Sequence, residues 1–214
     1  MTRLSIAPTP RLFAATALAC FLIALLGFGA ALPGYSHAMH PAALLGARGV
    51  PHWIGFDALG FVVPGLLAWW AHVRAGWQWQ VGAVPMGRVA AIGWTMCTIA
   101  ALAFAAQGVL AVDVTRGFGF GVGRLHTAMY MVWWIAFAAG AVVLAAGAGP
   151  TMPLRRARIG TLLAVIVVLA FALFVTVPGA PALGQKIAFA TWLAWLVAIV
   201  PATVAPRREA QLQG

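Results

Sequence analysis

The sequence predicts an all-α fold: a polytopic membrane protein, a bundle of six transmembrane helices with the N- and C-termini in the cytoplasm. Hydrophobic residues make up 64% of the 214 residues and charged residues only 7%, whereas a soluble domain carries about a quarter charged residues. Six apolar runs follow one another along the chain, each close to the roughly 20 residues that cross a hydrocarbon core. The basic residues between the runs are distributed unevenly, which favours one orientation.

The six runs are expected to be helices, because a backbone in lipid must satisfy its own hydrogen bonds. A membrane β-barrel would need short segments of alternating polarity, and continuous apolar stretches such as 162–175 do not alternate. A single membrane domain is predicted over 12–204, with residues 1–11 and 205–214 as cytoplasmic ends. Its helices are expected at 12–32, 56–73, 89–112, 125–148, 159–177 and 187–204.

The first run has an alternative interpretation as a cleaved signal peptide. Arg3 and Arg11 precede it, and the small residues Gly29, Ala30 and Ala31 close it. The apolar region of a signal peptide usually has about 7 to 15 residues, and this run is longer. A retained helix is therefore the prediction.

The orientation follows from the basic residues, because loops on the cytoplasmic side carry the excess of arginine and lysine. An inside N-terminus places more of them in the cytoplasm than outside. The inner set is Arg3, Arg11, Arg74, Arg88, Arg155, Arg156, Arg158, Arg207 and Arg208. The outer set is Arg48, Arg116, Arg124 and Lys186. The predicted location is the cell inner membrane.

The net charge of +10 does not indicate a nucleic-acid partner. A nucleic-acid domain gathers its cations on one face with aromatic stacking partners, whereas these arginines lie singly or in short clusters between apolar runs. The lipid bilayer is the predicted partner instead.

Polar side chains gather at the predicted outer ends of the helices. Four of the five histidines lie there, and polar groups in a membrane segment are candidates for function. The candidate ligand-binding residues are Ser36, His37, His40, His52, Asp57, Gln107, His126 and Tyr130.

The segment from Pro33 to Pro41 carries a metal hypothesis. If it forms a helical turn, His37 and His40 are neighbours at i and i+3, and imidazole is a good ligand for zinc, copper or haem iron. His126 would be the third ligand. The spacing is not specific to any metal or haem. Two alternatives stay open: histidines that hydrogen-bond backbone, water or headgroups, and histidines that sense pH.

The second helix carries a stripe at i+3 and i+4 spacing, formed by Asp57, Gly60, Pro64, Ala68 and His72. Such a stripe lies on one helix face. It is either a packing seam, in which small residues allow close helix approach, or the wall of a cavity with Asp57 at its mouth.

The next helices carry further polar groups, and the fifth carries none that suggest a site. Gln107 lies about 8 Å inside the outer end of the third helix and is expected to bond across to another helix. On the fourth, His126 and Tyr130 lead to Trp133 and Phe137 on one side, which indicates either a ligand slot or ordinary aromatic packing. The fifth, at 159–177, is expected to face lipid at the bundle edge.

Three motifs resemble an uncharacterised prokaryotic membrane family catalogued as domain of unknown function 998. They are the outer segment with Pro33-Gly-Tyr-Ser-His and Leu45-Gly-Ala-Arg-Gly-Val-Pro, the opening Gly60-Phe-Val-Val-Pro-Gly, and Gly123-Arg-Leu-His. The resemblance implies a compact bundle of about six helices and no known activity. Where the family often has Ser-Glu-Leu-Gly, this chain has Ala43-Leu-Leu-Gly, so an acidic residue of that loop is missing.

Three functions fit these features. The first is binding or transport of a lipid or small hydrophobic molecule in an outward-facing pocket between the second, third and fourth helices. The second is an accessory subunit of a larger membrane complex, and homo- or hetero-oligomers fit this reading. The third is a metal-dependent membrane hydrolase acting on lipid, in which a metal activates water beside Ser36, His37, His40, Asp57 and His126.

Overall fold

The computed structural model describes residues 8–81, 86–115, 119–147 and 155–202. Within these ranges the chain is helical and contains no strand, apart from two isolated bridges. The helices are α1 (Pro10–Ala31), η1 (Ala42–Leu44), α2 (Trp53–Phe56), η2 (Asp57–Val62), α3 (Val63–Val81), α4 (Arg88–Val109), α5 (Gly121–Gly147), α6 (Arg155–Leu169), η3 (Ala170–Phe174) and α7 (Leu183–Ile199). The prediction of an all-α fold is confirmed for the described residues.

Five helical stretches of the described chain are long and apolar enough to cross a membrane. They are Pro10–Ala31, Trp53–Gln80, Arg88–Val109, Gly121–Gly147 and Ala157–Phe174. A shorter apolar helix, Leu183–Ile199, corresponds to the sixth predicted run. These lengths are compatible with a multi-pass helical membrane protein.

The start of α1 illustrates how the local sequence sets a boundary. The Thr9 hydroxyl accepts a hydrogen bond from the backbone N–H of Leu12, and Pro10 occupies the first helical turn. An N-cap threonine satisfies one otherwise free N–H. Proline has no N–H to leave unpaired at this position.

The second helical stretch is longer than predicted, because α3 continues to Val81 and not to Val73. The prediction ended where His72 and Arg74 lower the hydropathy. In the structure Ala75 and Gln78 are nevertheless buried against the bundle, so the interior face of the helix continues beyond the apolar run.

Residues 57–62 form a π-helical segment, η2, between α2 and α3. A π-turn adds one residue to the helical turn and frequently lies near functional sites. Asp57 begins this segment, and both Asp57 and Phe61 point inward and are buried.

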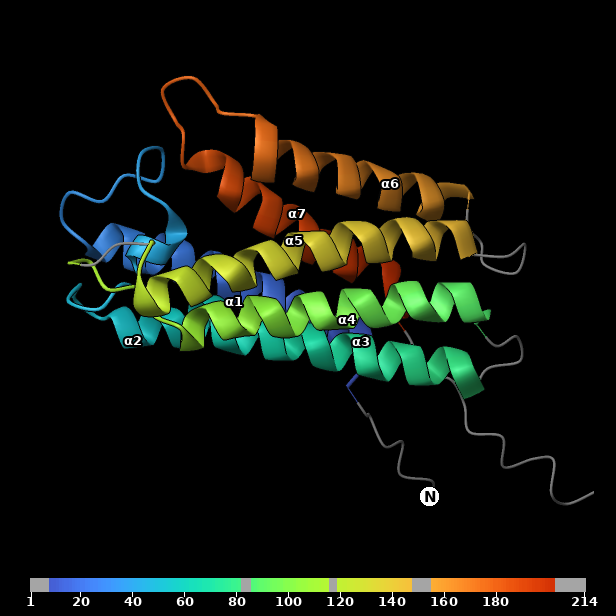
Figure 1. The fold of residues 1–214 in the computed structure, drawn as a ribbon. Helices are drawn as coiled ribbons and strands as arrows, with labels where there is room; N and C mark the ends of the chain where they lie inside the picture. Colours follow the sequence, from blue (N-terminus) through green and yellow to red (C-terminus); the bar gives the residue numbers. More distant parts are fainter. Residues whose placement is uncertain (1–7, 82–85, 116–118, 148–154, 203–214) are drawn as a thin grey trace, which may run out of the picture.

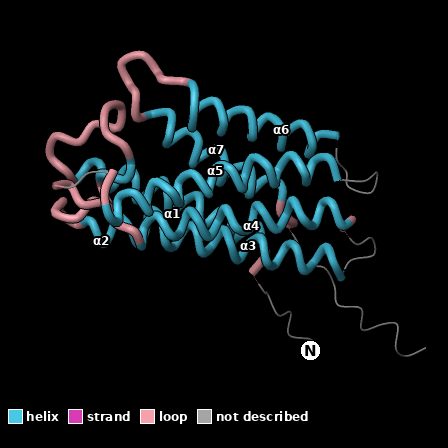
Figure 2. The backbone as a smooth tube through the Cα atoms, in the orientation of Figure 1, coloured by secondary structure: helices cyan, strands magenta, loops and turns pink. Residues whose placement is uncertain are grey.

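The two ends of the bundle hold different residues, and Figures 1 and 2 show which segments lie at each end. The segments 32–52, 110–115 and 175–182 lie at one end, which we call the histidine end because His37, His40, His52 and His126 lie there. The other end, where α1 and α4 begin, holds Arg11, Arg88 and Arg158, and we call it the arginine end.

Several predicted cytoplasmic and outer residues lie outside the described residues. These are Arg3 in 1–7, Arg116 in 116–118, and Arg207 and Arg208 in 203–214. The predicted cytoplasmic tail at 205–214 lies outside them as well.

Helices α4 and α5 form the most extensive helix pair of the bundle. Gly93 of α4 and Gly140 of α5 lie face to face: a Cβ on Gly93 would lie 2.5 Å from the Gly140 carbonyl oxygen, and one on Gly140 would lie 2.7 Å from that of Gly93. Small residues allow helices in membranes to approach this closely.

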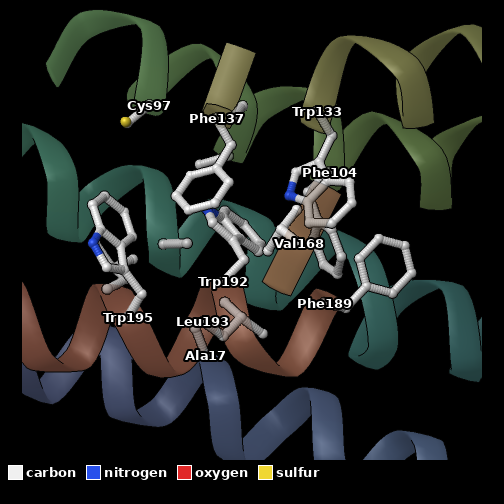
Figure 3. Packing of buried hydrophobic residues seen from close by; sticks show 14 of the residues in the cluster. Ala17, Cys97, Phe104, Trp133, Phe137, Val168, Phe189, Trp192, Leu193 and Trp195 are labelled. Atoms are coloured by element: carbon white, nitrogen blue, oxygen red, sulfur yellow. The ribbon is translucent and has the colours of Figure 1, made fainter. Parts of the chain in front are cut away.

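An aromatic cluster joins α4, α5 and α7 at the centre of the bundle (Figure 3). The ring centroid of Phe104 is 5.0 Å from those of Phe189 and Trp192, and the Trp133 centroid is 4.7 Å from that of Phe189. All four side chains are fully buried. Edge-to-face and tilted pairs of this kind add to the stabilisation from burial alone.

Helix α6 lies at the edge of the bundle (Figure 1), as its composition predicts. It leaves large apolar side chains such as Ile159, Leu163 and Ile166 exposed. A run of exposed apolar residues this extensive marks a surface that contacts lipid or another protein.

Candidate functional site

Lys186, in the first turn of α7, connects the segment 33–41 to the bundle through hydrogen bonds. Its ammonium nitrogen donates hydrogen bonds of 2.6 Å to the backbone carbonyls of both His37 and His40. It also lies 5.4 Å from the centre of the Tyr35 ring, which is within the range of a cation–π contact. The residue is only 4% exposed, so this cation has exchanged water for carbonyl oxygens and a ring face.

Sequence reasoning placed Lys186 among the outer charges and missed this role. Lys186 is the only lysine in a chain with twelve arginines, and this exception in the sequence could have indicated a specific role for the residue. An ammonium group donates in three directions from a compact centre, whereas a guanidinium is a planar fork. The converging carbonyls of His37 and His40 fit the ammonium.

The imidazole rings of His37 and His40 both pack against the Tyr35 ring, with centroid distances of 5.1 Å and 5.6 Å. His40 Nδ1 accepts a 3.0 Å hydrogen bond from the backbone N–H of Ser36. The His37 ring packs against Gly29 of α1, where an added Cβ would lie 2.6 Å from it. Both rings therefore order the turn.

Two titrating groups in this turn are held in their neutral forms near pH 7. Desolvation lowers the pKa of His37, and the neighbouring charge of Lys186 lowers it further. Burial raises the pKa of Tyr35 to about 12. Near pH 7 the side chains of His37 and Tyr35 therefore lie beside the Lys186 cation as neutral groups.

Asp57 is 5% exposed and packs directly against Gly46, which has no room for a Cβ. Its Oδ2 atom has no hydrogen-bond partner among the described residues. Gly108 of α4 lies against the Asp57 carbonyl oxygen and Phe61, where a Cβ would be 2.7 Å and 2.8 Å away. The start of the second helical stretch is therefore tightly packed around its carboxylate.

All five members of the stripe Asp57, Gly60, Pro64, Ala68 and His72 are buried. At its far end, the His72 Nδ1–H donates to the Ala68 carbonyl at 2.8 Å. Trp94 of α4 donates to the His72 carbonyl at 2.9 Å. This geometry is that of a packing seam between α3 and α4.

His126 closes the end of α4. Its Nδ1 lies 2.9 Å from the carbonyl oxygen of Gln107 and 3.2 Å from that of Leu110. Because carbonyl oxygens only accept, Nδ1 carries the proton. The last carbonyls of a helix have no partner within the helix, and this imidazole supplies one.

The prediction that the Gln107 amide bonds across to another helix is wrong. The side chain is fully buried, and neither Oε1 nor Nε2 has a hydrogen-bond partner among the described residues. The bond across to α5 is made by the Gln107 backbone carbonyl and His126, because α4 ends beside that imidazole.

The proposed slot beyond His126 is filled by rings. Tyr130 lies 5.7 Å from Trp133 and 5.9 Å from Phe189 between centroids, and its hydroxyl donates to the Ala172 carbonyl at 3.5 Å. Phe137 packs on Trp195 at 5.0 Å. This arrangement matches aromatic packing, the second of the two interpretations.

The structure does not bring the predicted metal ligands together. Among the residues described, no group of three or more histidine, cysteine, aspartate or glutamate side chains is arranged to hold a metal ion. His40 and His126 direct Nδ1 to backbone partners instead. These contacts match the alternative in which the histidines hydrogen-bond the backbone.

His52 is exposed and adopts a left-handed backbone conformation with φ of 62°. It lies at the rim of an apolar cavity of about 370 Å³ between α1 and the start of the second helical stretch. Cys20 and Phe28 of α1 and Leu59 of η2 line this cavity. Among the candidate residues from the sequence, His52 borders this cavity.

A larger cavity of about 890 Å³ lies at the arginine end, between α6 and α7. Arg11 of α1 and Trp79 of α3 border it, and small residues such as Ala164 and Ala198 form its walls. We call it the arginine-end cavity. Trp195 and Thr161 close part of its floor through a 3.0 Å hydrogen bond between the indole N–H and the hydroxyl.

Sequence reasoning missed this cavity, because no motif marks it. The signal present in the sequence was a stripe of small residues, Ala157, Gly160 and Ala164, along one face of an otherwise bulky apolar helix. A stripe of small residues leaves space when the facing helix also carries small residues, as α7 does with Ala194 and Ala198.

Comparison of the chain with protein-family models, curated proteins and solved structures finds no match. The class that the fold supports is a multi-pass helical membrane protein. The resemblance to the family catalogued as domain of unknown function 998 stays a prediction.

Proposed function

We propose that this chain spans the cell inner membrane six times, with both ends in the cytoplasm, and binds or transports a lipid or small hydrophobic molecule. Helix α7 serves as the sixth span: its 17 residues measure roughly 26 Å at 1.5 Å per residue, close to the ~30 Å of a hydrocarbon core. The positive-inside rule supports the orientation, with the arginine end in the cytoplasm.

The arginine-end cavity is the observation that carries the binding function. Its volume of about 890 Å³ lies within the range of about 300 to 1,000 Å³ that ligand pockets occupy. Its walls are mainly aliphatic and aromatic, and its polar side chains are few: Arg11, Thr161 and Thr191. This composition favours an amphiphile with an apolar body.

We place the ligand here and not in the pocket that the sequence predicts between the second, third and fourth helices. At the histidine end, Lys186, His40 and His126 already bond backbone groups. The rings of Tyr130 and Trp133 occupy the neighbouring space. A ligand there would have to displace contacts that hold the bundle together.

Filling the cavity is expected to remove lipid binding. Ala164 lines the cavity, and Ala164→Trp would place an indole within it. Phosphatidylcholine retained by the purified protein in mild detergent, counted by native mass spectrometry, is expected to fall severalfold. Ala139→Trp is the matched control, because Ala139 is exposed on α5 and does not line the cavity. Equal retention by both variants would reject the proposed function.

The proposed orientation has its own test, by cysteine labelling in whole cells after Cys20 and Cys97 are replaced by alanine. Met39→Cys at the exposed histidine end is expected to react with a membrane-impermeant maleimide. Gly87→Cys, before α4 at the opposite end, is expected to react only after permeabilisation. The reverse pattern would invert the topology.

A further inference from the structure

We propose that the arginine-end cavity holds an anionic phospholipid, whose acyl chain lies between α6 and α7 and whose phosphate binds the Arg11 guanidinium. The inference rests on the proposed function, because it names the class of lipid that the cavity takes. The residues at the mouth of the cavity indicate the headgroup, and the residues of its walls indicate the acyl chain.

Arg11 has most of its hydrogen-bonding capacity free. Within the described part of the chain its side chain makes one hydrogen bond, in which Nη2 donates to the Val200 carbonyl at 3.2 Å, whereas a guanidinium has five N–H donors. The same residue is fixed by its backbone N–H, which donates to the Pro201 carbonyl at 3.3 Å. The remaining donors stay available at the cavity mouth.

Among the described residues, the charge of Arg11 also has no acidic counterpart within the cavity. None of the lining residues is acidic. The acidic residues of the described chain, Asp57 and Asp113, belong to the histidine end. A phosphate diester supplies the missing negative charge, and its paired oxygens match the planar donor fork of arginine.

The rest of the cavity favours a lipid over a free anion. Leu163, Ala164 and Val167 of α6 face Ala194 and Ala198 of α7 across it. A free phosphate would leave this apolar space unfilled, whereas an acyl chain removes its surface from water. Basic pockets between transmembrane helices on the cytoplasmic side bind anionic headgroups in this way.

Trp79 of α3 lies at the same end of the cavity as Arg11 and is half-buried. Tryptophan is enriched at the level of the headgroups, where its ring is apolar and its N–H is polar. The pair Arg11 and Trp79 therefore marks the depth at which the phosphate would lie.

The test compares two lipids with identical acyl chains, phosphatidylglycerol and phosphatidylcholine, bound to the purified full chain in mild detergent. Wild-type protein is expected to bind phosphatidylglycerol the more tightly. Arg11→Gln, which keeps an N–H donor for the Val200 carbonyl, is expected to weaken phosphatidylglycerol binding about tenfold, the loss of one charge-assisted contact. Its binding of phosphatidylcholine is expected to stay unchanged.

Two controls separate the charge from the fold. Arg88→Gln removes an exposed arginine at the same end that does not line the cavity, and it is expected to bind both lipids as wild type does. Arg11→Lys is expected to restore part of the preference. Inorganic phosphate at millimolar concentration is expected not to displace phosphatidylglycerol; displacement would assign the site to a free anion and overturn the proposal.

The outcomes distinguish this inference from the proposed function. If Arg11→Gln binds phosphatidylglycerol as wild type does, or loses both lipids equally, the headgroup assignment fails. The lipid cavity itself then still stands, provided that Ala164→Trp lowers the binding of both lipids. If Ala164→Trp changes neither, the cavity is not the site and both proposals fall.

Discussion

Lys186→Met is expected to destabilise the protein by about 3 kcal/mol and to loosen the segment 33–41. Methionine keeps the apolar length of the side chain but leaves the His37 and His40 carbonyls without the donor they share. A carbonyl that loses its partner costs about 1 to 3 kcal/mol when it is buried, and both of these carbonyl bonds are part-buried. For a chain of this size such a loss lowers the melting temperature by roughly 10 °C, which thermal unfolding in detergent measures.

The matched control is Arg124→Met, which removes an exposed cation from the same end of the bundle. Exposed charges contribute little to stability, so this variant is expected to melt close to wild type. Lys186→Arg is expected to fall between the two, because the larger planar group keeps the charge but not the geometry. Equal melting temperatures of Lys186→Met and wild type would show that the hydrogen bonds of the ammonium do not stabilise the fold.

The second large effect is expected at the contact between α4 and α5. Gly93→Ala places a Cβ 2.5 Å from the Gly140 carbonyl oxygen and against the Leu144 backbone. Backbone atoms cannot rotate away as a flexible side chain can, so the helices must separate. Overpacking of this kind costs about 1 to 3 kcal/mol, and Gly93→Leu is expected to prevent assembly of the folded bundle.

Gly27→Ala is the matched control for this prediction, because a Cβ at Gly27 meets nothing within 4 Å. Alanine is the better helix former by up to about 1 kcal/mol, so this variant is expected to be as stable as wild type or slightly more stable. Thermal unfolding of the pair in the same detergent measures the difference. A Gly93→Ala protein as stable as Gly27→Ala would contradict the close approach of the two helices.

The helices could be predicted from the sequence because the hydrogen bonds of a helix lie within the apolar run that forms it. The predicted end of the second helix was wrong, because that boundary depends on tertiary packing. Helix α3 continues to Val81, with Ala75 and Gln78 buried against the bundle. Hydropathy along the sequence does not show which side of a helix is buried. The position of α6 at the edge could be predicted because the run 159–177 is almost entirely apolar, and such a helix can face lipid.

The site was harder to predict, because its chemistry depends on contacts between residues far apart in the chain. The sequence pattern placed four histidines at one end, but it did not indicate their hydrogen-bond partners. His126 bonds the end of α4, and Lys186 bonds carbonyls of a turn almost 150 residues earlier in the chain. The arginine-end cavity arises where small residues of two helices face each other. Neither helix alone shows that space.

The contact between Lys186 and the segment 33–41 has a practical consequence for chemical labelling. Because Lys186 is the only lysine of the chain and its ammonium is bonded and enclosed in the fold, acylating reagents meet no accessible ε-amine in the native molecule. The extent of acylation at this position is therefore a chemical reporter of how often the turn detaches from α7.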